Sequence, residues 1–334
     1  MTGMSASHRP RALPTAADVH DAAARLAGVA VRTPLLSFPV LDAAVGARVV
    51  VKPEMFQRTG AFKFRGAYNK IAQIAPERRS AGVVAWSSGN HAQGVAAAAR
   101  LFAMPATIVM PADAPRAKIA RTRAFGAEVV TYDRVRESRE EIGSRLAAVR
   151  GATVVPPFDD ADIIAGQGTV GLEIAEDCVE RGLEPDVVVV PASGGGLIAG
   201  VALAIAERFA AARIVSAEPA GFDDHARSFA SGRRESNDRL AGSICDALLM
   251  ASPGEITFEI TRRLVGEGVA VSDAEVETAM RFAFDELKLV VEPGGAVALA
   301  AVLAGRFRGA ATIAVVMSGG NVDRDLYARI LAGG

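Results

Sequence analysis

Lys63 lies between Phe62 and Phe64 in the segment AFKFRGA at residues 61–67, in a chain of which only 5% is aromatic. Apolar neighbours exclude water and disfavour the charged ammonium, which lowers the pKa of a lysine. A lysine amine that is neutral near pH 7 can form an imine with an aldehyde. The segment therefore indicates either a covalent amine site at Lys63 or the end of an amphipathic element from which Lys63 extends into solvent.

Two glycine-rich turns could bind phosphate. The turn SSGNHAQG at 87–94 follows a predicted strand that ends at Trp86, and SGGGL at 193–197 follows one that ends at Pro191. Glycines allow the backbone to approach a phosphate group closely, at the positive end of the helix that follows. The second turn lacks the G-x-G-x-x-G spacing of dinucleotide sites, so a mononucleotide-sized phosphate fits it better. Each turn alone indicates either a tight connection or a phosphate site.

Short apolar runs alternate with alanine-rich stretches of helical pattern along the chain. Continuous apolar runs are typical of parallel strands buried on both faces, and this alternation predicts an α/β fold with parallel sheets. The predicted strands are Val49–Lys52, Gly82–Trp86, Ala106–Met110, Glu128–Tyr132, Thr153–Pro157, Asp186–Pro191, Arg213–Ala217 and Thr312–Met317. The predicted helices are Ala16–Ala27 with Thr15 as N-cap, His91–Phe102, Lys118–Phe125, Arg139–Val149 and Leu197–Phe209.

The composition excludes several classes of function. Half of the 334 residues are hydrophobic, and 37 basic residues balance 38 acidic ones, which predicts a large core and argues against nucleic acid as a partner. The apolar runs are too short to span a bilayer, and residues 1–14 carry no signal-peptide pattern, so we expect a flexible tail there. Cys178 and Cys245 lie far apart, which argues against a disulfide framework and favours a cytoplasmic location.

Four segments occur together in this chain and in one order: AFKFRGA at 61–67, SSGNHAQG at 87–94, SGGGL at 193–197 and SGGN at 318–321. The combination resembles the fold type II pyridoxal-phosphate enzymes, which share the tryptophan synthase β-like fold. Within them it resembles the serine/threonine dehydratase (threonine ammonia-lyase) and serine racemase branch. The resemblance runs from about residue 15 to the C-terminus. It implies two parallel-sheet α/β domains with the cofactor between them, a large one from 15–60 and 159–334 and a smaller one from 61–158.

The resemblance also implies which residues bind pyridoxal 5'-phosphate. Lys63 would hold the cofactor covalently and act as base and acid at Cα, Phe62 would lie against the ring, and Asn90 would bind the phenolic oxygen. The remaining cofactor contacts are Ser193, Gly194, Gly195, Gly196 and Leu197 at the phosphate, and Ser318 with Glu292 at the pyridine nitrogen. The family usually has a glycine where Ser193 stands, which puts the backbone angle of the loop in doubt there, although a serine hydroxyl can donate to a phosphate oxygen.

The substrate contacts implied by the resemblance lie mainly in the first turn. Ser87, Ser88 and the backbone at Asn90 and His91 would bind the substrate carboxylate, and Ser88 would face Lys63 across the ring as a second base. Arg139 sits where serine racemase places an arginine that can reach bound acids. A solvated helix surface at Arg139 remains an equal alternative.

A loop after the strand at 213–217 offers oxygen ligands. Glu218, Asp224 and the backbone carbonyl of Phe222 have the spacing of the divalent-cation site of the serine racemase branch, and such ligands suit Mg²⁺ or Ca²⁺. The alternative is a plain loop with surface acids. His225 follows this loop and has no assigned role beyond that of a neighbour.

The chain is therefore expected to be a lyase that converts L-threonine, L-serine or a related 3-hydroxy amino acid such as hydroxyaspartate to a 2-oxo acid and ammonia. The alternative is a serine racemase that uses the same site. β-Replacement is disfavoured because that branch carries a TSGNTG-like loop, and a module without catalysis is disfavoured because Lys63 is present. We expect a homodimer, and we expect no extra C-terminal regulatory domain in a chain that ends at residue 334.

Overall fold

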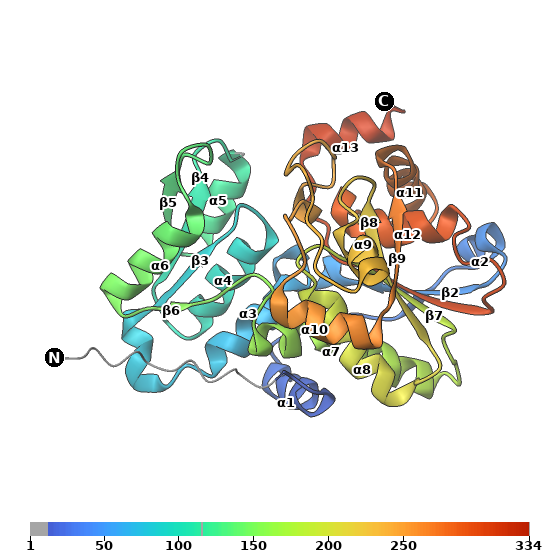
Figure 1. Cartoon of the computed structure of the whole chain (residues 1–334), viewed down its shortest axis with the longest axis horizontal. Helices are drawn as coiled ribbons and strands as arrows, with labels where there is room; N and C mark the ends of the chain where they lie inside the picture. The colour runs from blue at the N-terminus through green and yellow to red at the C-terminus, as the bar shows by residue number, and fades with distance from the viewer. Residues whose placement is uncertain (1–12, 115, 334) are drawn as a thin grey trace.

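The computed structural model describes residues 13–114 and 116–333, so most of the tail predicted at 1–14 lies outside the described residues. The polypeptide forms two sheets with helices on both faces of each, and the two layered bodies stand side by side (Figure 1). This arrangement confirms the predicted fold class of two parallel-sheet α/β units. None of the described helices is long and apolar enough to cross a membrane.

The larger sheet has six strands in the order β1-β2-β10-β7-β8-β9. All neighbours are parallel except β1, which pairs antiparallel with β2 at the sheet edge. The strands are β1 (Leu36–Ser37), β2 (Arg48–Pro53), β7 (Val187–Pro191), β8 (Arg213–Pro219), β9 (Glu267–Val271) and β10 (Thr312–Met317).

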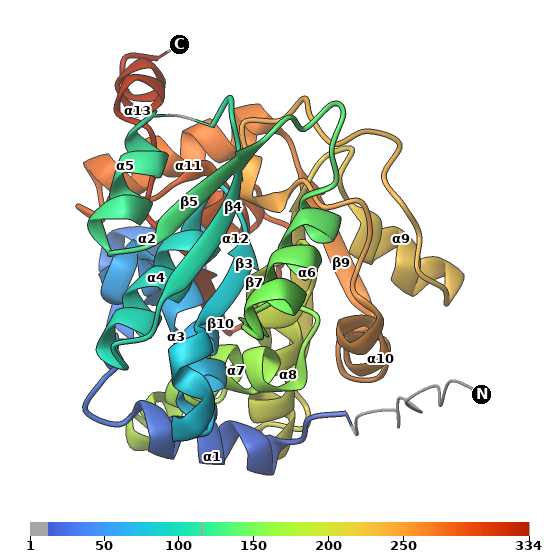
Figure 2. The same ribbon diagram turned by 90° about the vertical axis from the view of Figure 1, so that its left-hand side faces the viewer.

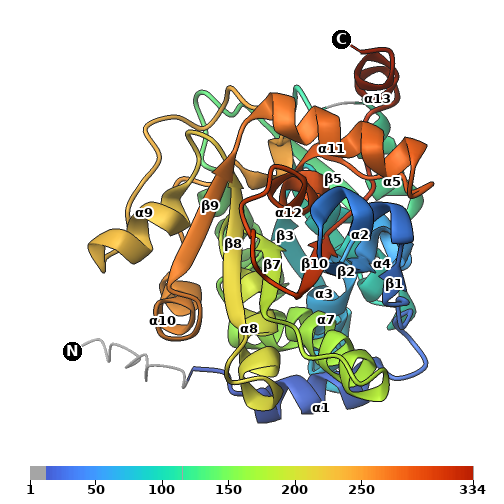
Figure 3. The same ribbon diagram turned by 90° about the vertical axis from the view of Figure 1, so that its right-hand side faces the viewer.

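Alternate residues of these strands enter two different cores, because successive side chains of a strand point to opposite faces. Val187 and Val189 pack under α11 and α12, whereas Val188 and Val190 pack under α7 and α8 (Figure 3). The helices of this body are α1 (Ala16–Leu26), α2 (Pro39–Val45), α7 (Ala161–Glu180), α8 (Gly196–Arg208), α9 (Asp224–Ser231), α10 (Glu255–Leu264), α11 (Asp273–Asp285), α12 (Pro293–Leu303) and α13 (Arg324–Leu331).

The smaller sheet has four parallel strands in the order β5-β4-β3-β6. The helices α4 and α5 cover one face, and α6 covers the other (Figure 2). The elements are β3 (Val83–Trp86), β4 (Ala106–Pro111), β5 (Glu128–Tyr132), β6 (Thr153–Val154), α4 (Asn90–Leu101), α5 (Arg116–Ala124) and α6 (Arg139–Arg150).

The strand prediction at Thr153–Pro157 was too long, since β6 ends at Val154. Pro156 and Pro157 cannot donate backbone hydrogen bonds, so the ladder stops before them. The sequence analysis also missed β9 and several helices of the larger body, among them the 20-residue helix α7.

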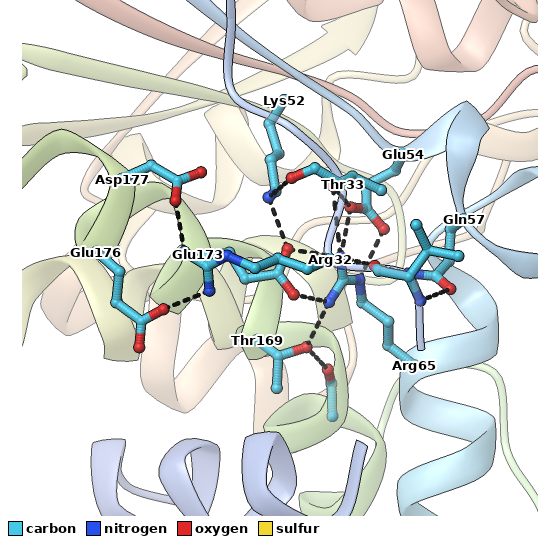
Figure 4. Close-up of polar contacts among 12 residues, drawn as sticks. Arg32, Thr33, Lys52, Glu54, Gln57, Arg65, Thr169, Glu173, Glu176 and Asp177 are labelled. Atoms are coloured by element: carbon cyan, nitrogen blue, oxygen red, sulfur yellow. Dashed lines mark hydrogen bonds and ion pairs between the residues drawn. The ribbon is translucent and has the colours of Figure 1, made fainter. Parts of the chain in front are cut away.

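Helix α3 (Lys63–Ala72) joins the two bodies, because it packs on α4 of the smaller one and on α7 of the larger one. A buried cluster of charges fixes its first turn (Figure 4). The Arg65 guanidinium donates to Glu54 at 2.8 Å and to Glu173 at 2.6 Å, and the Lys52 ammonium donates to Glu173 at 2.6 Å. The predicted boundary between the two domains at 60/61 stays a prediction.

Candidate active site

One pocket lies between the two bodies, outside the carboxyl ends of parallel strands, where α/β proteins bind ligands. It is lined by the turn after β3, the turn after β7 and the residue after β10. The first and the last of these three segments are more than 200 residues apart in the sequence, and only the fold brings them together. The pocket brings together every predicted cofactor and substrate residue: Phe62, Lys63, Ser87, Ser88, Asn90, His91, Arg139, Ser193, Gly194, Gly195, Gly196, Leu197, Glu292 and Ser318.

Lys63 begins α3 and directs its amine into this pocket. Its Nζ donates to the carbonyl oxygen of Pro157 at 2.7 Å and lies 5.1 Å from the centroid of the Phe62 ring. Burial of the amine lowers its pKa to about 8, because an enclosed ammonium loses hydration. The neutral form of Lys63, which imine chemistry requires, is therefore much more populated near physiological pH than that of an exposed lysine.

The turn after β7 has the geometry of a phosphate cradle. Gly195 is the N-cap of α8 and has φ +93°, a left-handed conformation that glycine adopts without strain. A Cβ on Gly194 would overlap the Phe158 ring, and a Cβ on Gly195 would lie 2.8 Å from Thr257 Oγ1. The first N–H groups of α8 have no partner within the helix, so an anion can bind them. The residues present thus fit a phosphorylated cofactor.

Glu292, Asn90 and Asn321 form a hydrogen-bonded chain in the wall of the pocket. Asn90 Nδ2 donates to Glu292 Oε1 at 2.5 Å, and Asn321 Nδ2 donates to Asn90 Oδ1 at 2.8 Å. Burial raises the pKa of Glu292 to about 7, which the hydrogen bond from Asn90 partly opposes. Ser318 is 5% exposed and lines the same pocket. Asn321 was not predicted as a site residue, although it belongs to the SGGN segment.

The turn after β3 presents backbone groups to the pocket and turns one side chain away from it. The Gly89 N–H donates to Ser87 Oγ at 3.2 Å, and α4 begins at Asn90. The His91 Nε2 lies 2.9 Å from the Val155 carbonyl, and burial and the Lys63 charge lower the pKa of His91 to about 3. Its imidazole is therefore neutral and held at the base of the turn. This agrees with a role for the backbone at position 91.

Two cations stand at the mouth of the pocket. Arg139 begins α6, donates to Glu140 at 2.8 Å and lines the pocket, while its side chain is 34% exposed, so its role in substrate binding stays a prediction. Lys118 of α5 forms a 2.6 Å ion pair with Asp246, from the short helix at 246–248 (η4). The sequence analysis missed Lys118 and Asp246, and no local pattern marks either residue. Only the tertiary fold brings them together.

The predicted cation loop lies outside the pocket, beside α9. Glu218 and Asp224 are both fully buried. Burial raises the pKa of Glu218 well above its usual range, with a further contribution from Asp224, and burial also raises the pKa of Asp224 to about 6. Asp224 Oδ2 has no hydrogen-bond partner. An unpartnered carboxylate oxygen beside a second buried carboxylate fits a divalent cation. No cluster of three or more Asp, Glu, His and Cys side chains suited to a metal occurs in the described chain.

His225 has a more specific place than the sequence analysis gave it. Its backbone N–H donates to Glu218 Oε1 at 2.9 Å, and its Nε2 lies 2.6 Å from the Ser193 carbonyl oxygen in the turn after β7. The residue thus touches both the acidic pair and the pocket wall. The adjacency of His225 to Glu218 and Asp224 was visible in the sequence, but its contact with Ser193 was not.

Comparison with known proteins agrees with this geometry. Residues 27–319 match the family model described as pyridoxal-phosphate dependent enzyme. The chain is 46% identical to an L-threo-3-hydroxyaspartate ammonia-lyase of a Pseudomonas species, over 95% of this chain and 98% of that one. It is 42% identical to an L-threonine ammonia-lyase of Thermotoga maritima, over 95% of this chain and 78% of that one. The structure of maize serine racemase superimposes with a TM-score of 0.90 at 39% identity, and the match covers 96% of this chain and 98% of that one.

These findings confirm the predicted cofactor, the branch resemblance and the prediction of a pyridoxal-phosphate-dependent lyase. The match covers both sheets and all the residues that line the pocket except Asn321, which lies two positions beyond its end. The chain belongs to the family of pyridoxal-phosphate dependent enzymes.

Proposed function

We propose that this enzyme is an ammonia-lyase that converts a small 3-hydroxy amino acid to a 2-oxo acid and ammonia. The observation that carries this proposal is the position of the buried Lys63 amine in a pocket that also holds a turn suited to phosphate. The most similar relatives described above act, by their names, on L-threo-3-hydroxyaspartate and L-threonine. L-Serine is the third candidate substrate.

The proposed residue roles are those that the family resemblance implies, and the place of each residue in the pocket supports them. Bound pyridoxal phosphate supplies an electron-accepting ring that stabilises negative charge at the substrate Cα. Lys63 Nζ holds the cofactor and then moves the Cα proton. Phe62 limits the ring on one side, while Ser87, Ser88 and the backbone at 90–91 hold the substrate carboxylate. Ser193 to Leu197 bind the phosphate.

The polar groups of the pocket wall control where a proton resides. Asn90 and Glu292 form one hydrogen-bonded unit, and Ser318 offers a neutral hydroxyl. A hydroxyl does not force a facing ring nitrogen to stay protonated, whereas a carboxylate does. Ser318 would thereby favour rapid loss of the β-hydroxyl over slower transfer reactions. If Ser318→Asp left both the rate and the product distribution unchanged, this role would be wrong.

The pocket cations favour an acidic substrate among the candidates. Arg139 and Lys118 line the pocket, and each now pairs with a carboxylate of the protein. A second substrate carboxylate could take the place of either partner. We therefore place L-threo-3-hydroxyaspartate first. The test is release of ammonia and 2-oxo acid by the wild-type enzyme from L-threo-3-hydroxyaspartate, L-threonine and L-serine. No release from any of them would contradict the proposal.

Serine racemisation is the second candidate function, because Ser88 and Lys63 line the same pocket and could serve as two bases on opposite faces. The 39% identity to maize serine racemase adds support. The measurement is D-serine formation from L-serine by wild type and by Ser88→Ala. Racemisation that is undiminished in Ser88→Ala would remove Ser88 from this role.

A divalent cation, Mg²⁺ or Ca²⁺, is proposed at Glu218, Asp224 and the Phe222 carbonyl. The unpartnered Asp224 Oδ2 supports it. Thermal unfolding with and without a chelator tests the site, with Asp224→Asn as the comparison. A wild-type midpoint that does not respond to chelator or to added cation would contradict it. The expected homodimer and the cytoplasmic location stay predictions.

A further inference from the structure

Two buried side chains contact the back of the phosphate loop, residues 193–196. His225 Nε2 lies 2.6 Å from the Ser193 carbonyl oxygen, and Thr257 Oγ1 donates to the Gly194 carbonyl oxygen at 2.7 Å. Both residues are fully buried, and neither is among the residues that line the pocket. They therefore contact the loop from the side that faces the larger body.

These two contacts set the direction of two peptide groups. A carbonyl oxygen only accepts hydrogen bonds, so His225 must carry its proton on Nε2 and donate it. In a planar trans peptide the C=O and the following N–H point in opposite directions. With its carbonyl held by His225, the Ser193–Gly194 peptide turns the Gly194 N–H away from His225. Thr257 does the same for the Gly195 N–H through the Gly194 carbonyl, which also accepts a 3.1 Å hydrogen bond from the Gly254 N–H.

The side away from His225 and Thr257 is the side of the pocket. Gly194 and Gly195 both line the pocket, whereas the two side chains behind them do not. The N–H groups of these glycines are thus turned toward the place where an anion would bind at the start of α8. No cis peptide, which would reverse this geometry, occurs in the described chain.

Both side chains are themselves fixed in place. The backbone N–H groups of His225 and Ala226 donate to the Glu218 carboxylate at 2.9 and 3.0 Å, which fixes the first turn of α9. The Thr257 N–H donates to Asp159 Oδ1 at 3.2 Å at the start of α10. A Cβ on Gly195 would lie 2.8 Å from both His225 Cε1 and Thr257 Oγ1, so the loop rests directly on them.

We propose that His225 and Thr257 are positioning residues for the cofactor phosphate. They hold the loop carbonyls from behind, so that the amides of Gly194 and Gly195 are aligned toward the phosphate before it binds. This inference rests on the proposed role of residues 193–197 as the phosphate site. It adds two residues that touch neither cofactor nor substrate.

The experiment compares two aldehydes that differ by one phosphate group. Full-length protein freed of cofactor is titrated with pyridoxal 5'-phosphate and with pyridoxal, and attachment at Lys63 is followed by absorbance. The variants are Thr257→Val, which is nearly isosteric, His225→Leu, and His225→Gln, which can still donate. Thr261→Val is the matched control, because Thr261 is a buried threonine on the same helix whose hydroxyl bonds within α10.

Loss of one aligned amide is expected to weaken pyridoxal-phosphate binding about tenfold, the scale of a single hydrogen bond. Pyridoxal binding should not change in Thr257→Val or His225→Leu, and His225→Gln should recover part of the loss. Thr261→Val should match wild type for both aldehydes. Inorganic phosphate should compete less well in the two weakened variants.

If a variant bound pyridoxal 5'-phosphate and pyridoxal more weakly by the same factor, the proposal would be overturned, because the substitution would then have a general structural effect. Unchanged binding of both would overturn it as well. If His225→Leu fails to fold, Thr257→Val decides the outcome alone. Wild-type turnover of hydroxy amino acids is measured separately, so failure of the proposed reaction is distinguishable from failure of this inference.

Discussion

At the scale of single residues, the chemistry depends on how burial changes protonation. The Lys63 amine is enclosed beside Phe62. Loss of hydration lowers its pKa, because an enclosed amine is more stable in its neutral form. Burial also favours the neutral form of Glu292, but for a carboxyl group the neutral form is the protonated one. Burial therefore raises the pKa of Glu292, whereas it lowers that of Lys63. One physical cause thus supplies a free amine and a retained proton in the same pocket.

Covalent capture of pyridoxal phosphate by Lys63 is expected to follow the titration of this amine. The proton must leave before nitrogen can attack the aldehyde, so the capture rate should rise as pH increases through about 8 rather than through 10.5. Stopped-flow absorbance from pH 6.5 to 10 measures this. Lys63→Arg should show no covalent signal at any pH. A wild-type midpoint above 10 would contradict the buried-amine account.

Glu292 should make stability depend on pH in a definite window. Its pKa is raised from 4.5 to about 7 on folding, so the folded state keeps a proton that the unfolded state has lost between these values. This contribution, on the order of 3 kcal/mol, is complete below pH 4.5 and disappears as pH rises through 7. Urea unfolding at pH 5 and pH 8 should therefore differ less in Glu292→Gln than in wild type. Identical pH dependence in both proteins would contradict the prediction.

At the scale of elements, helix α3 carries Lys63 on its first residue and is anchored two residues later. Arg65 is fully buried and bonds to Glu54 and Glu173, which come from the segment after β2 and from α7. The guanidinium is planar and has five donors, so one side chain can hold both carboxylates. The cluster thus fixes the start of α3 relative to the larger body (Figure 4).

Arg65→Met should destabilise the protein by about 3–5 kcal/mol, because the buried Glu54 carboxylate loses its ion-pair partner and Glu173 keeps only Lys52. The measurement is the free energy of unfolding in urea at pH 7. Arg213→Met is the matched control, since Arg213 also bonds a glutamate, Glu267, but is more than half exposed. An exposed pair contributes about 1 kcal/mol or less. Equal losses in the two variants would show that burial does not matter here.

At the scale of the whole molecule, the pocket exists because the two bodies meet. Lys118 belongs to the smaller body and Asp246 to the larger one, and their 2.6 Å ion pair joins the two sides of the pocket mouth. Such a pair can exchange its internal carboxylate for that of a substrate. The proposed preference for an acidic substrate therefore depends on the assembled fold rather than on one segment.

Asp246→Asn should shift preference toward the acidic substrate. Without its internal partner, Lys118 is free to bind a second carboxylate, so kcat/KM for L-threo-3-hydroxyaspartate should rise at least about threefold relative to that for L-serine. Lys118→Met should shift the ratio in the opposite direction. Steady-state ammonia release measures both. A ratio unchanged in the two variants would exclude the ion pair from substrate selection.

The amino-acid pattern was sufficient for the local features of this protein. The apolar runs that became β7 and β10 were predicted nearly to the residue, because a strand buried on both faces needs continuous apolar side chains. The family and its cofactor followed from four short segments, since the backbone needs glycine where φ is positive, as at Gly195. The helix α7 was missed because its glycines mask the helical pattern, although they permit close packing on α8.

The sequence by itself therefore predicted the fold class from its apolar patterns, and the cofactor from the resemblance of four short segments to one family, because both depend on residue type and short-range order. The tertiary structure alone decided which groups face one another: His225 and Thr257 behind the phosphate loop, Lys118 with Asp246 at the pocket mouth, and Arg65 between two glutamates. Such contacts join residues 11 to 128 positions apart, and their energies depend on distance and burial in space. Neither the distance between two residues in space nor their burial can be read from a short stretch of the sequence.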